Sequence, residues 1–501
     1  MNHCLLFSVT DKLKSRSSGV HRIANHLRTH QEWDVEVIDF FYSWTLDELK
    51  ELVRSRVTDN TRFFGFSFLF LTKHIQNNIT PFCEWARENY PNIVFISGGQ
   101  GDQIYNNMID YHVGGYGEYA LDTLLAYLFS NGPKPVFQLN TNTKNKTRTR
   151  VINALANYPA YPMHDPMIKY EARDFIMPGE WGRIEFSRGC KFKCKFCSFP
   201  VLGVQEDYTR HADSAREQLM HAYDNWGIED YLVSDETFND RTEKITKFAN
   251  MVETLPWRPY FGGYVRADLL VSRPADRHEL LRMGLFSQFY GIESFNQQTS
   301  KFVGKGMNVE KLQAGLIDVK NFFKANSPKN YFAGSIAVIA GLPYETLETL
   351  DSTYKWIRQN WSDQVIIASA LEISQHLHYR HSDIDKNYLK YGYREMQGLQ
   401  DLNLSIQDVN FLIGNNDHVI WENDHMNFVQ ALEWVKKMTS MKTFGGQDYQ
   451  RLGMGTISST ICDENGNPVN RERKVSLSRA DGIHKYWNVF LESYKRKKLS
   501  L

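Results

Sequence analysis

The chain has 501 residues, enough for more than one domain, because a domain usually contains about 100–200 residues. Lys plus Arg and Asp plus Glu both total 58, so the net charge is zero and the overall charge does not favour a nucleic-acid partner. The longest apolar run, Phe63 to Leu71, is far shorter than the ~20 residues of a membrane-spanning helix, and the N-terminus lacks the features of a secretory signal. The sequence therefore predicts a soluble, cytoplasmic protein without membrane contact.

Short apolar strands alternate with amphipathic helices over the first hundred residues. Strands are expected at 4–9, 35–39, 63–70 and 93–97, and helices at 19–28, 46–57 and 75–90. This alternation predicts parallel strands joined by crossover helices, which is the pattern of a doubly wound α/β sheet. Ligands of such sheets bind beyond the carboxyl ends of the strands.

Three glycine- or serine-containing segments follow strands in this region. They are Ser67-Phe68-Leu69, Gly98-Gly99, and a glycine-rich turn that ends in Gly117-Glu118 before an expected helix at 120–129. Small residues at strand ends would let a large planar ligand approach the backbone closely. The glycines fit ordinary turns equally well. Residues 136–180 contain several prolines and a polar, basic stretch, and they are predicted to form a hairpin and a linker.

Three of the six cysteines lie close together as Cys190, Cys194 and Cys197, with C-x3-C-x2-C spacing. Thiolates bind zinc or an iron–sulfur cluster. A structural zinc site needs four protein ligands, and His211 is the nearest downstream imidazole, whereas three cysteines on a four-iron cluster leave one iron open. The spacing therefore favours an iron–sulfur cluster, with a zinc knuckle as the alternative. The scattered Cys4, Cys83 and Cys462 are expected to be packing thiols in a reducing compartment.

Strands and helices alternate again after the cysteines. Strands are expected at 183–188, 231–234, 260–265, 287–292, 333–339 and 365–370, and the helices between them at 214–226, 242–255, 274–283, 309–325 and 349–360. Six such units predict a partial, open (β/α)6 TIM-like barrel with its active site at the carboxyl face.

The C-terminal region, residues 376–501, is predicted to be an α-rich extension that caps the open barrel. It contains His376, His378 and His381, which are interpreted as surface residues, and helices are expected at 424–438 and 483–495. The basic run Lys495 to Lys498 is predicted to be a solvated tail. The expected domains are 1–135, 136–180 (linker), 181–375 and 376–501.

The segment from about 183 to 375 resembles the radical S-adenosylmethionine superfamily. The resemblance is carried by the cysteine triplet with Phe196 before its last cysteine, and by Ser187-Arg188-Gly189-Cys190 at its start. It implies that Cys190, Cys194 and Cys197 bind three irons of a [4Fe–4S] cluster, while the methionine moiety of S-adenosylmethionine chelates the fourth.

The same resemblance assigns further cofactor contacts. It places Asp235 and Glu236 at the methionine amino group, Arg266 at the carboxylate, Glu293 at the ribose hydroxyls, Gly341 and Leu342 at the adenine, and Phe196 beside the cluster. Local alternatives exist for several of them. Asp235 fits a helix cap, Arg266 fits an ion pair with Asp268, and Gly341-Leu342 fits a simple turn.

The N-terminal pattern is similar to the cobalamin-binding domain that precedes the barrel in many members of this superfamily. The resemblance assigns cobalamin contacts to Ser67, Leu69, Gly98, Gly99, Gly117 and Glu118. The D-x-H-x-x-G loop of that domain is absent, because residues 10–19 read TDKLKSRSSG, without a histidine.

The resemblance implies an enzyme that cleaves S-adenosylmethionine reductively to a 5′-deoxyadenosyl radical, for cobalamin-dependent methylation of an unactivated carbon. The alternatives are a cobalamin-free radical rearrangement or cyclisation, and a metal-binding module without enzymatic activity. The implied partners are an external electron donor such as a flavodoxin or ferredoxin, and a small-molecule or peptide substrate.

Overall fold

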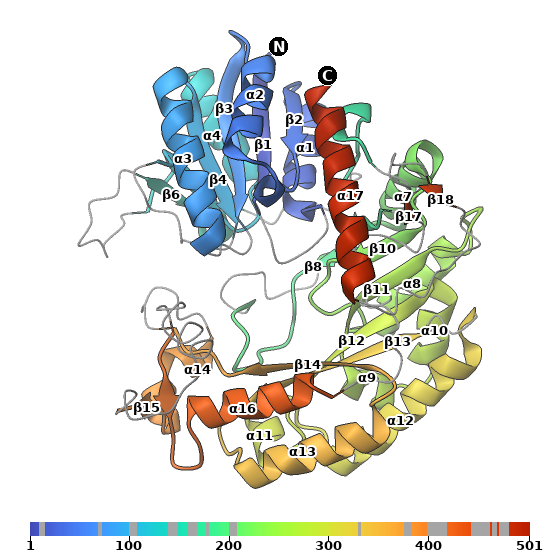
Figure 1. Cartoon of the computed structure of the whole chain (residues 1–501). Coiled ribbons are helices and arrows are strands. Elements are labelled where there is room, and N and C mark those ends of the chain that lie inside the picture. The colour runs from blue at the N-terminus through green and yellow to red at the C-terminus, as the bar shows by residue number, and fades with distance from the viewer. Residues whose placement is uncertain are drawn as a thin grey trace.

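The computed structural model describes residues 1–9, 16–68, 73–99, 108–138, 149–158, 168–176, 180–199, 208–328, 332–374, 382–397, 418–441, 461–462, 468–469 and 480–501. Two of the sequence predictions, for Leu69 and for the histidines at 376, 378 and 381, lie outside these residues. Within them, two six-stranded parallel sheets dominate the molecule, and Figure 1 shows the N-terminal sheet above the second sheet. The predicted α/β class with an open barrel is confirmed.

The N-terminal sheet has the strand order β2-β1-β3-β4-β5-β6. Apolar residues alternate along its central strand: Leu5 and Phe7 pack on one face, while Cys4 and Leu6 pack on the other. Both faces are therefore covered by helices, as parallel sheets require. The elements are β1 (His3–Val9), α1 (Ser18–His30), β2 (Asp34–Ile38), η1 (Phe41–Ser43), α2 (Leu46–Arg56), β3 (Thr61–Phe68), α3 (Lys73–Asn89), β4 (Val94–Gly99), β5 (Tyr111–Gly114), α4 (Glu118–Phe129), β6 (Arg150–Asn153), α5 (Ala154–Asn157) and η2 (Ala172–Asp174).

The segment predicted as a linker contributes to this sheet. β6 pairs in parallel with β5, and Ile152 on β6 is fully buried. Only one of its four residues faces the core, so the strand is too short for its alternation to be recognised. Further along, Glu180 forms a buried ion pair with Arg16 (2.7 Å), which fixes the end of the predicted linker against the N-terminal sheet.

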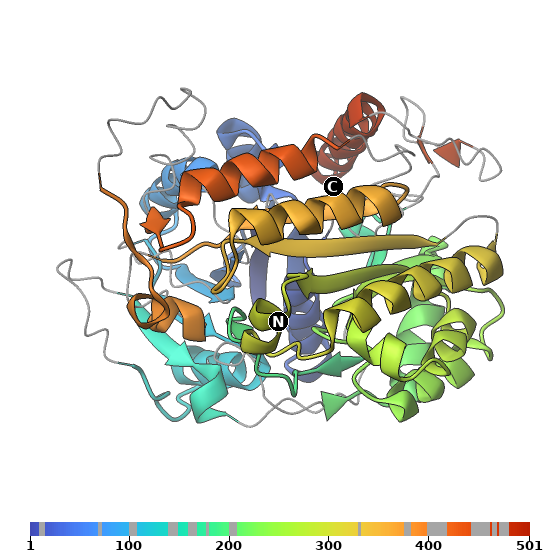
Figure 2. The same cartoon turned by 90° about the horizontal axis from the view of Figure 1, so that it is seen from below.

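The second sheet has the order β14-β13-β12-β11-β10-β7, with every pair parallel, and it does not close into a full barrel. Figure 2 shows helices along its outer face. The elements are β7 (Gly182–Ile184), β8 (Ser187–Arg188), β9 (Tyr208–Thr209), α7 (Ala212–Trp226), β10 (Asp230–Val233), α8 (Thr242–Val252), β11 (Tyr260–Val265), α9 (Ala267–Ser272), α10 (Asp276–Met283), β12 (Leu285–Glu293), α11 (Gln297–Phe302), α12 (Val309–Asn326), β13 (Ala333–Ala340), α13 (Leu347–Asn360) and β14 (Val365–Ala370).

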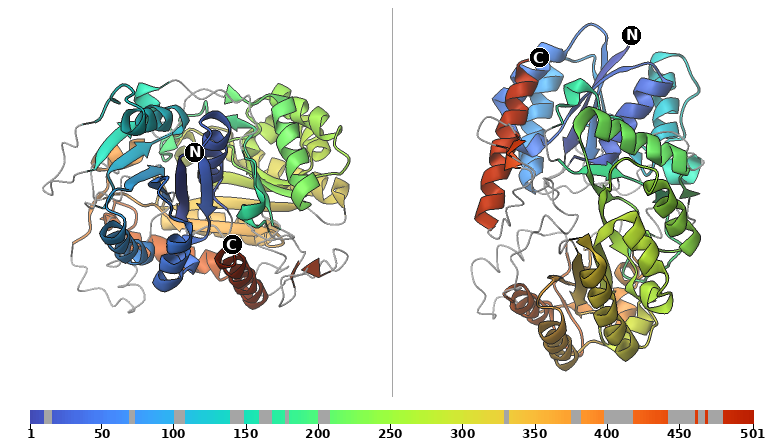
Figure 3. Two further views of the ribbon diagram at one scale, coloured as in Figure 1. Left: turned by 90° about the horizontal axis from the view of Figure 1, so that it is seen from above. Right: turned by 90° about the vertical axis from the view of Figure 1, so that its right-hand side faces the viewer.

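The C-terminal region was predicted to cap the barrel, but its helices divide between the two sheets. α16 packs on the barrel edge through Ala431 and Trp434, whose indole N–H donates to the Leu350 carbonyl (2.9 Å). α17 instead lies alongside the N-terminal sheet (Figure 3), because Phe490, Leu491 and Tyr494 belong to the core of that sheet. The remaining elements are α14 (Asp383–Lys386), η5 (Tyr388–Tyr391), β15 (Arg394–Glu395), β16 (Trp421–Glu422), α16 (Phe428–Thr439), β17 (Ile461–Cys462), β18 (Pro468–Val469) and α17 (Ala480–Leu499).

The basic C-terminal run is a solvated tail only in part, because Arg496 and Lys497 are exposed. Lys498 is fully buried and pairs with Glu36 at 3.0 Å, and Lys495 pairs with Glu48 at 3.1 Å. The prediction was wrong for these two lysines because their acidic partners lie more than 400 residues earlier in the chain. No helix in the described ranges is both long and apolar enough to cross a membrane.

Candidate active site

A cavity of about 230 Å³ opens at the carboxyl edge of the N-terminal sheet. In the order 2-1-3-4-5 the connections reverse direction between β1 and β3, which is where such sheets bind their ligands. Four of the residues predicted to contact cobalamin line this cavity, namely Ser67, Gly98, Gly99 and Gly117. Glu118 is not among the lining residues, because its carboxylate is fully buried in ion pairs described below.

Different physical reasons explain why glycine occupies each of the two positions at the end of β4. A Cβ on Gly99, whose φ is +136°, would overlap the Phe68 carbonyl oxygen, so the backbone itself excludes any side chain. A Cβ on Gly98 would meet only the Val113 carbonyl, at an ordinary 3.6 Å. Gly98 could therefore carry a side chain, and what the glycine provides at this position is space in the cavity.

Sequence reasoning missed part of the cavity wall. Ser17, Ser18 and Gly19, between β1 and the first turn of α1, line the cavity, as do Arg22 and Tyr116. The first three fall in the segment where the family's histidine loop is absent, so no motif pointed to them.

The cysteine loop starts directly after β8 at the carboxyl face of the barrel sheet. Its backbone is fixed from two sides: the Lys195 N–H donates to the Val303 carbonyl (3.2 Å), and the Lys195 carbonyl accepts from the Ile384 N–H (3.0 Å). All three thiols of the triplet are partly exposed, whereas Cys4 and Cys83 are buried. The burial of Cys4 and Cys83 agrees with their prediction as packing thiols.

Each thiol of the triplet has one polar neighbour. Cys190 Sγ lies 3.8 Å from Thr237 Oγ1, Cys194 Sγ lies 3.7 Å from Arg266 Nη1, and Cys197 Sγ accepts from the Phe199 N–H (3.4 Å). Within the described part of the chain, no three Cys, His, Asp or Glu side chains converge on a single metal ion. Three partly exposed sulfurs on one loop are the donor set that a [4Fe–4S] cluster takes from a protein.

Burial raises the pKa of the Cys197 thiol to about 11, and the neighbouring Cys194 and Cys190 add to this rise although the Phe199 N–H opposes it. The thiol therefore carries its proton at neutral pH. Binding of a metal requires loss of that proton, so loading of this site must release acid.

The two acidic residues after β10 have different surroundings. Both oxygens of Asp235 are engaged, one by the Phe186 N–H (2.8 Å) and the other by the Ser187 hydroxyl (2.6 Å). Asp235 is therefore not a helix cap, and its two hydrogen bonds fix the start of the cysteine loop. Burial raises the pKa of Glu236 to about 8, and the nearby carboxylate of Glu185 contributes to this shift. Glu236 is therefore protonated at neutral pH and uncommitted to a cation.

The guanidinium of Arg266 already forms a bidentate ion pair within the protein. Its Nε and Nη2 bind the two oxygens of Asp268 at 3.0 and 2.6 Å, and its guanidinium lies 3.9 Å from the centroid of the Phe192 ring. The ion pair with Asp268, the local alternative, is therefore what the structure contains. Because its remaining nitrogen reaches Cys194, Arg266 places a positive charge beside the cysteine loop.

Glu293 ends β12 in the left-handed region, with φ of +67°, which is uncommon for a residue with a side chain. Its carboxylate lies 3.5 Å from Lys305 Nζ, and burial raises the pKa of Glu293 against the opposing effect of that lysine. A strained backbone at a strand end is typical of functional sites. The carboxylate also influences the pKa of Cys197, so it lies near the cysteine loop.

The Gly341-Leu342 segment forms a tightly bonded turn after β13. The N–H groups of Gly341 and Leu342 donate to the Glu345 carboxylate at 2.9 and 3.2 Å, and the Gly341 carbonyl accepts from the Tyr393 hydroxyl (2.6 Å). Gly341 has φ of +90°, and a Cβ there would overlap the ring of Trp421. These backbone groups are therefore committed within the protein, an arrangement that the sequence of the turn alone did not reveal.

The two candidate sites meet through a buried ionic network. Arg188, just before the first cysteine of the triplet, donates to Glu118 at 2.6 Å, and Arg22 of α1 contacts both Glu118 and Glu185 at 2.9 Å. Arg22 and Glu118 lie at the carboxyl edge of the N-terminal sheet, whereas Glu185 and Arg188 lie at that of the barrel sheet. The two edges therefore face each other.

Tyr116 lies on this junction and belongs to both sites. It lines the N-terminal cavity, and the Arg188 guanidinium lies 4.6 Å from the centroid of its ring. Burial, together with the nearby carboxyl groups of Glu236 and Glu185, raises the pKa of the Tyr116 hydroxyl. One side chain therefore connects the cavity to the acidic group beside the cysteine loop.

Breaking this junction should destabilise the protein strongly. Although burial alone raises the pKa of Glu118, Arg188 and Arg22 lower it to about 2, so the carboxylate is charged at neutral pH. Glu118→Gln would leave the positive charge of Arg188 buried with less negative charge beside it. This is expected to reduce the free energy of unfolding by about 3–5 kcal/mol. Urea denaturation measures the loss, and Glu253→Gln, which breaks the exposed pair with Arg282, should change it by less than about 1 kcal/mol. Equal effects of the two substitutions would contradict the proposed contribution of the junction to the free energy of unfolding.

Comparison with known proteins agrees with this geometry. Residues 184–357 match the model of the radical SAM superfamily. An uncharacterized methyltransferase of Pyrococcus horikoshii is 21% identical over 363 residues, which cover 68% of this chain and 72% of that protein. Hopanoid C-2 methylase of Rhodopseudomonas palustris is 26% identical over 267 residues, which cover 51% of this chain and 45% of that enzyme, so the match spans less than half of it.

Two solved structures share the fold over most of the chain. TsrM from Kitasatospora setae, a radical S-adenosylmethionine methyltransferase solved with tryptophan and an S-adenosylmethionine analogue, superposes with a TM-score of 0.64 at 13% identity, covering 91% of this chain and 93% of TsrM. OxsB, a cobalamin-dependent radical enzyme solved with aqua-cobalamin and S-adenosylmethionine, gives 0.64 at 15% identity, covering 100% of this chain and 72% of OxsB. The chain therefore contains a radical SAM superfamily domain at residues 184–357, and its fold as a whole is similar to that of these two structures.

Proposed function

We propose that this protein is a cobalamin-dependent radical S-adenosylmethionine methyltransferase that acts on an unactivated carbon of a small molecule or peptide. The observation that carries the proposal is Tyr116, which lines the N-terminal cavity and lies close to Glu236 beside the cysteine loop. Tyr116 would therefore lie between the proposed corrin cavity and the residues proposed to bind S-adenosylmethionine. The methyltransferase relatives and the two superposed structures support the same class.

The residues of the two sites have the following proposed roles. Cys190, Cys194 and Cys197 hold the [4Fe–4S] cluster, and Glu236 accepts a hydrogen bond from the methionine amino group of S-adenosylmethionine. When bound, the cluster and S-adenosylmethionine supply a 5′-deoxyadenosyl radical by reductive cleavage, and cobalamin supplies the methyl group. The electron comes from an external donor such as a flavodoxin or ferredoxin.

Other residues position these groups rather than contact them. Asp235 fixes the start of the cysteine loop through Ser187, and Arg266 balances the negative charge near Cys194. Ser67, Gly98 and Gly117 line the space for the corrin and its side groups. Glu293, strained and near the cysteine loop, is the proposed contact for the ribose hydroxyls.

The proposal is tested by anaerobic reconstitution of the full chain with iron, sulfide and hydroxocobalamin. Dithionite and S-adenosylmethionine are then added, 5′-deoxyadenosine is measured, and the corrin spectrum is recorded on protein freed of unbound cofactor. The proposal expects deoxyadenosine together with about one bound corrin per chain. Absence of deoxyadenosine from a fully loaded cluster would contradict the radical enzyme, and deoxyadenosine without bound corrin would leave the cobalamin-free alternative.

Glu236 gives the binding of S-adenosylmethionine a defined pH dependence. With a pKa of about 8 in the free protein, this carboxyl must lose its proton to accept a hydrogen bond from the amino group. Binding should therefore release a proton below pH 8, and the affinity should rise with pH up to about 8. Titration calorimetry in buffers of different ionisation enthalpy measures the released proton. Glu236→Gln should remove the part of this release that comes from the carboxyl and leave the part that comes from the amino group of S-adenosylmethionine, whose own pKa is about 8. An unchanged release in that variant would contradict the assignment.

A further inference from the structure

The cysteine loop lies next to an exposed surface that is far more basic than the chain as a whole. Residues 190–199, 297–307 and 382–391 together contain seven lysines and two aspartates, a net charge of +5, whereas the whole chain is neutral. Lys305 and Lys191 pair with Glu293 and Asp240 outside these segments, which leaves a net charge of +3 when those two carboxylates are included. The three segments are joined by the backbone hydrogen bonds of Lys195 and by ring contacts, and together with Tyr344, which contacts Phe302, they form what we call the lysine face. Lys193, Lys301 and Lys390 are exposed on it.

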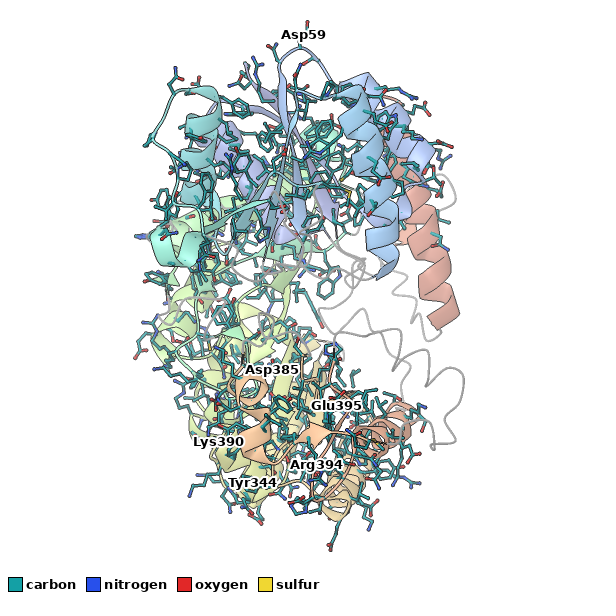
Figure 4. The ribbon with its side chains drawn as sticks, turned by 90° about the vertical axis from the view of Figure 1, so that its left-hand side faces the viewer. Asp59, Tyr344, Asp385, Lys390, Arg394 and Glu395 are labelled. Carbon is teal, nitrogen blue, oxygen red and sulfur yellow. The ribbon has the colours of Figure 1, made fainter. Side chains whose placement is uncertain are left out.

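Apolar side chains are exposed within the same face. Leu389 is 68% exposed and Tyr344 is 44% exposed, which is unusual for large apolar residues in the described part of the chain. Figure 4 shows Tyr344 and Lys390 on this side of the molecule. Tyr344 is held with φ of +70°, a conformation that residues with side chains rarely adopt. An apolar centre within a charged rim is the usual composition of a protein-binding surface.

The lysine face is also close to the sulfurs. The ring of Phe302 contacts Tyr344 (5.3 Å between centroids) on one side and Tyr391 (4.9 Å) on the other, and Lys195 Nζ lies 4.1 Å from its centroid. Lys195 directly follows Cys194. The exposed Gly304 lies against the loop, since a Cβ there would be 3.7 Å from Cys194 Cα. The lysine face therefore includes the cysteine loop and the residues packed directly against it.

We propose that the lysine face is the docking surface for a small acidic electron-carrier protein. This inference rests on the proposed function, because it assumes a cluster on the three cysteines. Charge complementarity selects an acidic partner, and the exposed side chains of Tyr344 and Leu389 offer apolar contacts beside the lysines. In the step that follows, the reduced carrier loses one electron and the oxidised cluster gains it, without any bond or proton changing place.

The test uses an acidic flavodoxin as the carrier and reverses two exposed charges of the lysine face, in the full-length variant Lys301→Glu/Lys390→Glu. Lys134→Glu/Lys355→Glu is the matched control, since both lysines are exposed and lie outside the face. Binding of the flavodoxin to the protein without cluster is measured by calorimetry at low salt. Formation of 5′-deoxyadenosine is measured on loaded protein, once with reduced flavodoxin and once with dithionite.

Charge reversal on the lysine face should weaken flavodoxin binding, and slow flavodoxin-driven deoxyadenosine formation, by about tenfold or more at low salt. The control should match the wild type, and about 0.5 M salt should remove most of the difference. Dithionite-driven formation should be unchanged in all variants. Flavodoxin binding that is equally tight in both variants would overturn the docking proposal. A wild-type dimer that dissociates on charge reversal would also overturn it, because the lysine face would then be a dimer interface. Absence of deoxyadenosine from wild-type protein with dithionite would instead contradict the proposed function.

Discussion

Cys194→Ala is expected to reduce the iron content of the reconstituted protein from about four per chain to nearly none, and to reduce 5′-deoxyadenosine formation to background. Only three protein sulfurs are proposed to hold the cluster, so loss of one leaves two irons without a protein ligand instead of one. The substitution should not unfold the chain, because Cys194 is partly exposed and its thiol has one weak contact, with Arg266 at 3.7 Å. Iron analysis, the visible absorption of the cluster and circular dichroism measure these effects.

Cys83→Ala is the matched control for this result. Cys83 is buried in the core of the N-terminal sheet, and burial raises the pKa of its thiol to about 12, so it is a packing thiol rather than a ligand. This variant should lose some stability through a small cavity, at most about 1–2 kcal/mol, and should keep its iron. Iron retention in Cys194→Ala, or iron loss in Cys83→Ala, would contradict the proposed ligand set.

Gly98→Leu is expected to abolish corrin binding while leaving reductive cleavage of S-adenosylmethionine intact. A leucine side chain at this position would project into a cavity of about 230 Å³ lined by Ser67 and Gly117, without a backbone clash at its Cβ. Affinity for hydroxocobalamin should fall by about 100-fold or more, equivalent to about 3 kcal/mol. Absorption spectroscopy of the gel-filtered protein measures the bound corrin.

Gly98→Ala separates loss of space from loss of folding at the same position. Its Cβ would make only an ordinary contact with the Val113 carbonyl, so this variant should fold and should retain most of the corrin affinity. Corrin binding that is unchanged in Gly98→Leu would contradict the assignment of the cavity. Loss of deoxyadenosine formation along with corrin in that variant would show that the two sites do not function separately.

The fold was largely predictable because its signals are local. The strand and helix periods identified both parallel sheets, and β14 begins and ends where it was expected, at Val365 and Ala370. The short β6 was missed because only one of its residues faces the core, and the position of α17 was missed because its partners lie at the other end of the chain. Secondary structure follows from neighbouring residues, whereas packing of distant segments does not.

In the candidate site, too, local patterns could be predicted and contacts between distant residues could not. The cysteine triplet is a local pattern and the structure places it where a cluster loop is expected, at the carboxyl edge of the first barrel strand. Which carboxylates are free was not predictable. Asp235 accepts from Ser187, 48 residues earlier, while its neighbour Glu236 accepts from backbone N–H groups, including that of Gly189, and no sequence pattern distinguishes the two. The ion pair of Glu118 was not predictable for the same reason, because its partner Arg188 lies 70 residues later in the chain.

The central claim is that one chain holds a cluster on Cys190, Cys194 and Cys197 within reach of a corrin in the N-terminal cavity. Electron paramagnetic resonance of protein loaded with both cofactors, with the cluster reduced and cobalt in the +2 state, tests this arrangement most directly. The facing edges joined by Tyr116 and Arg188 predict magnetic coupling that broadens both signals relative to singly loaded protein. A spectrum that equals the sum of the two singly loaded spectra would contradict the account.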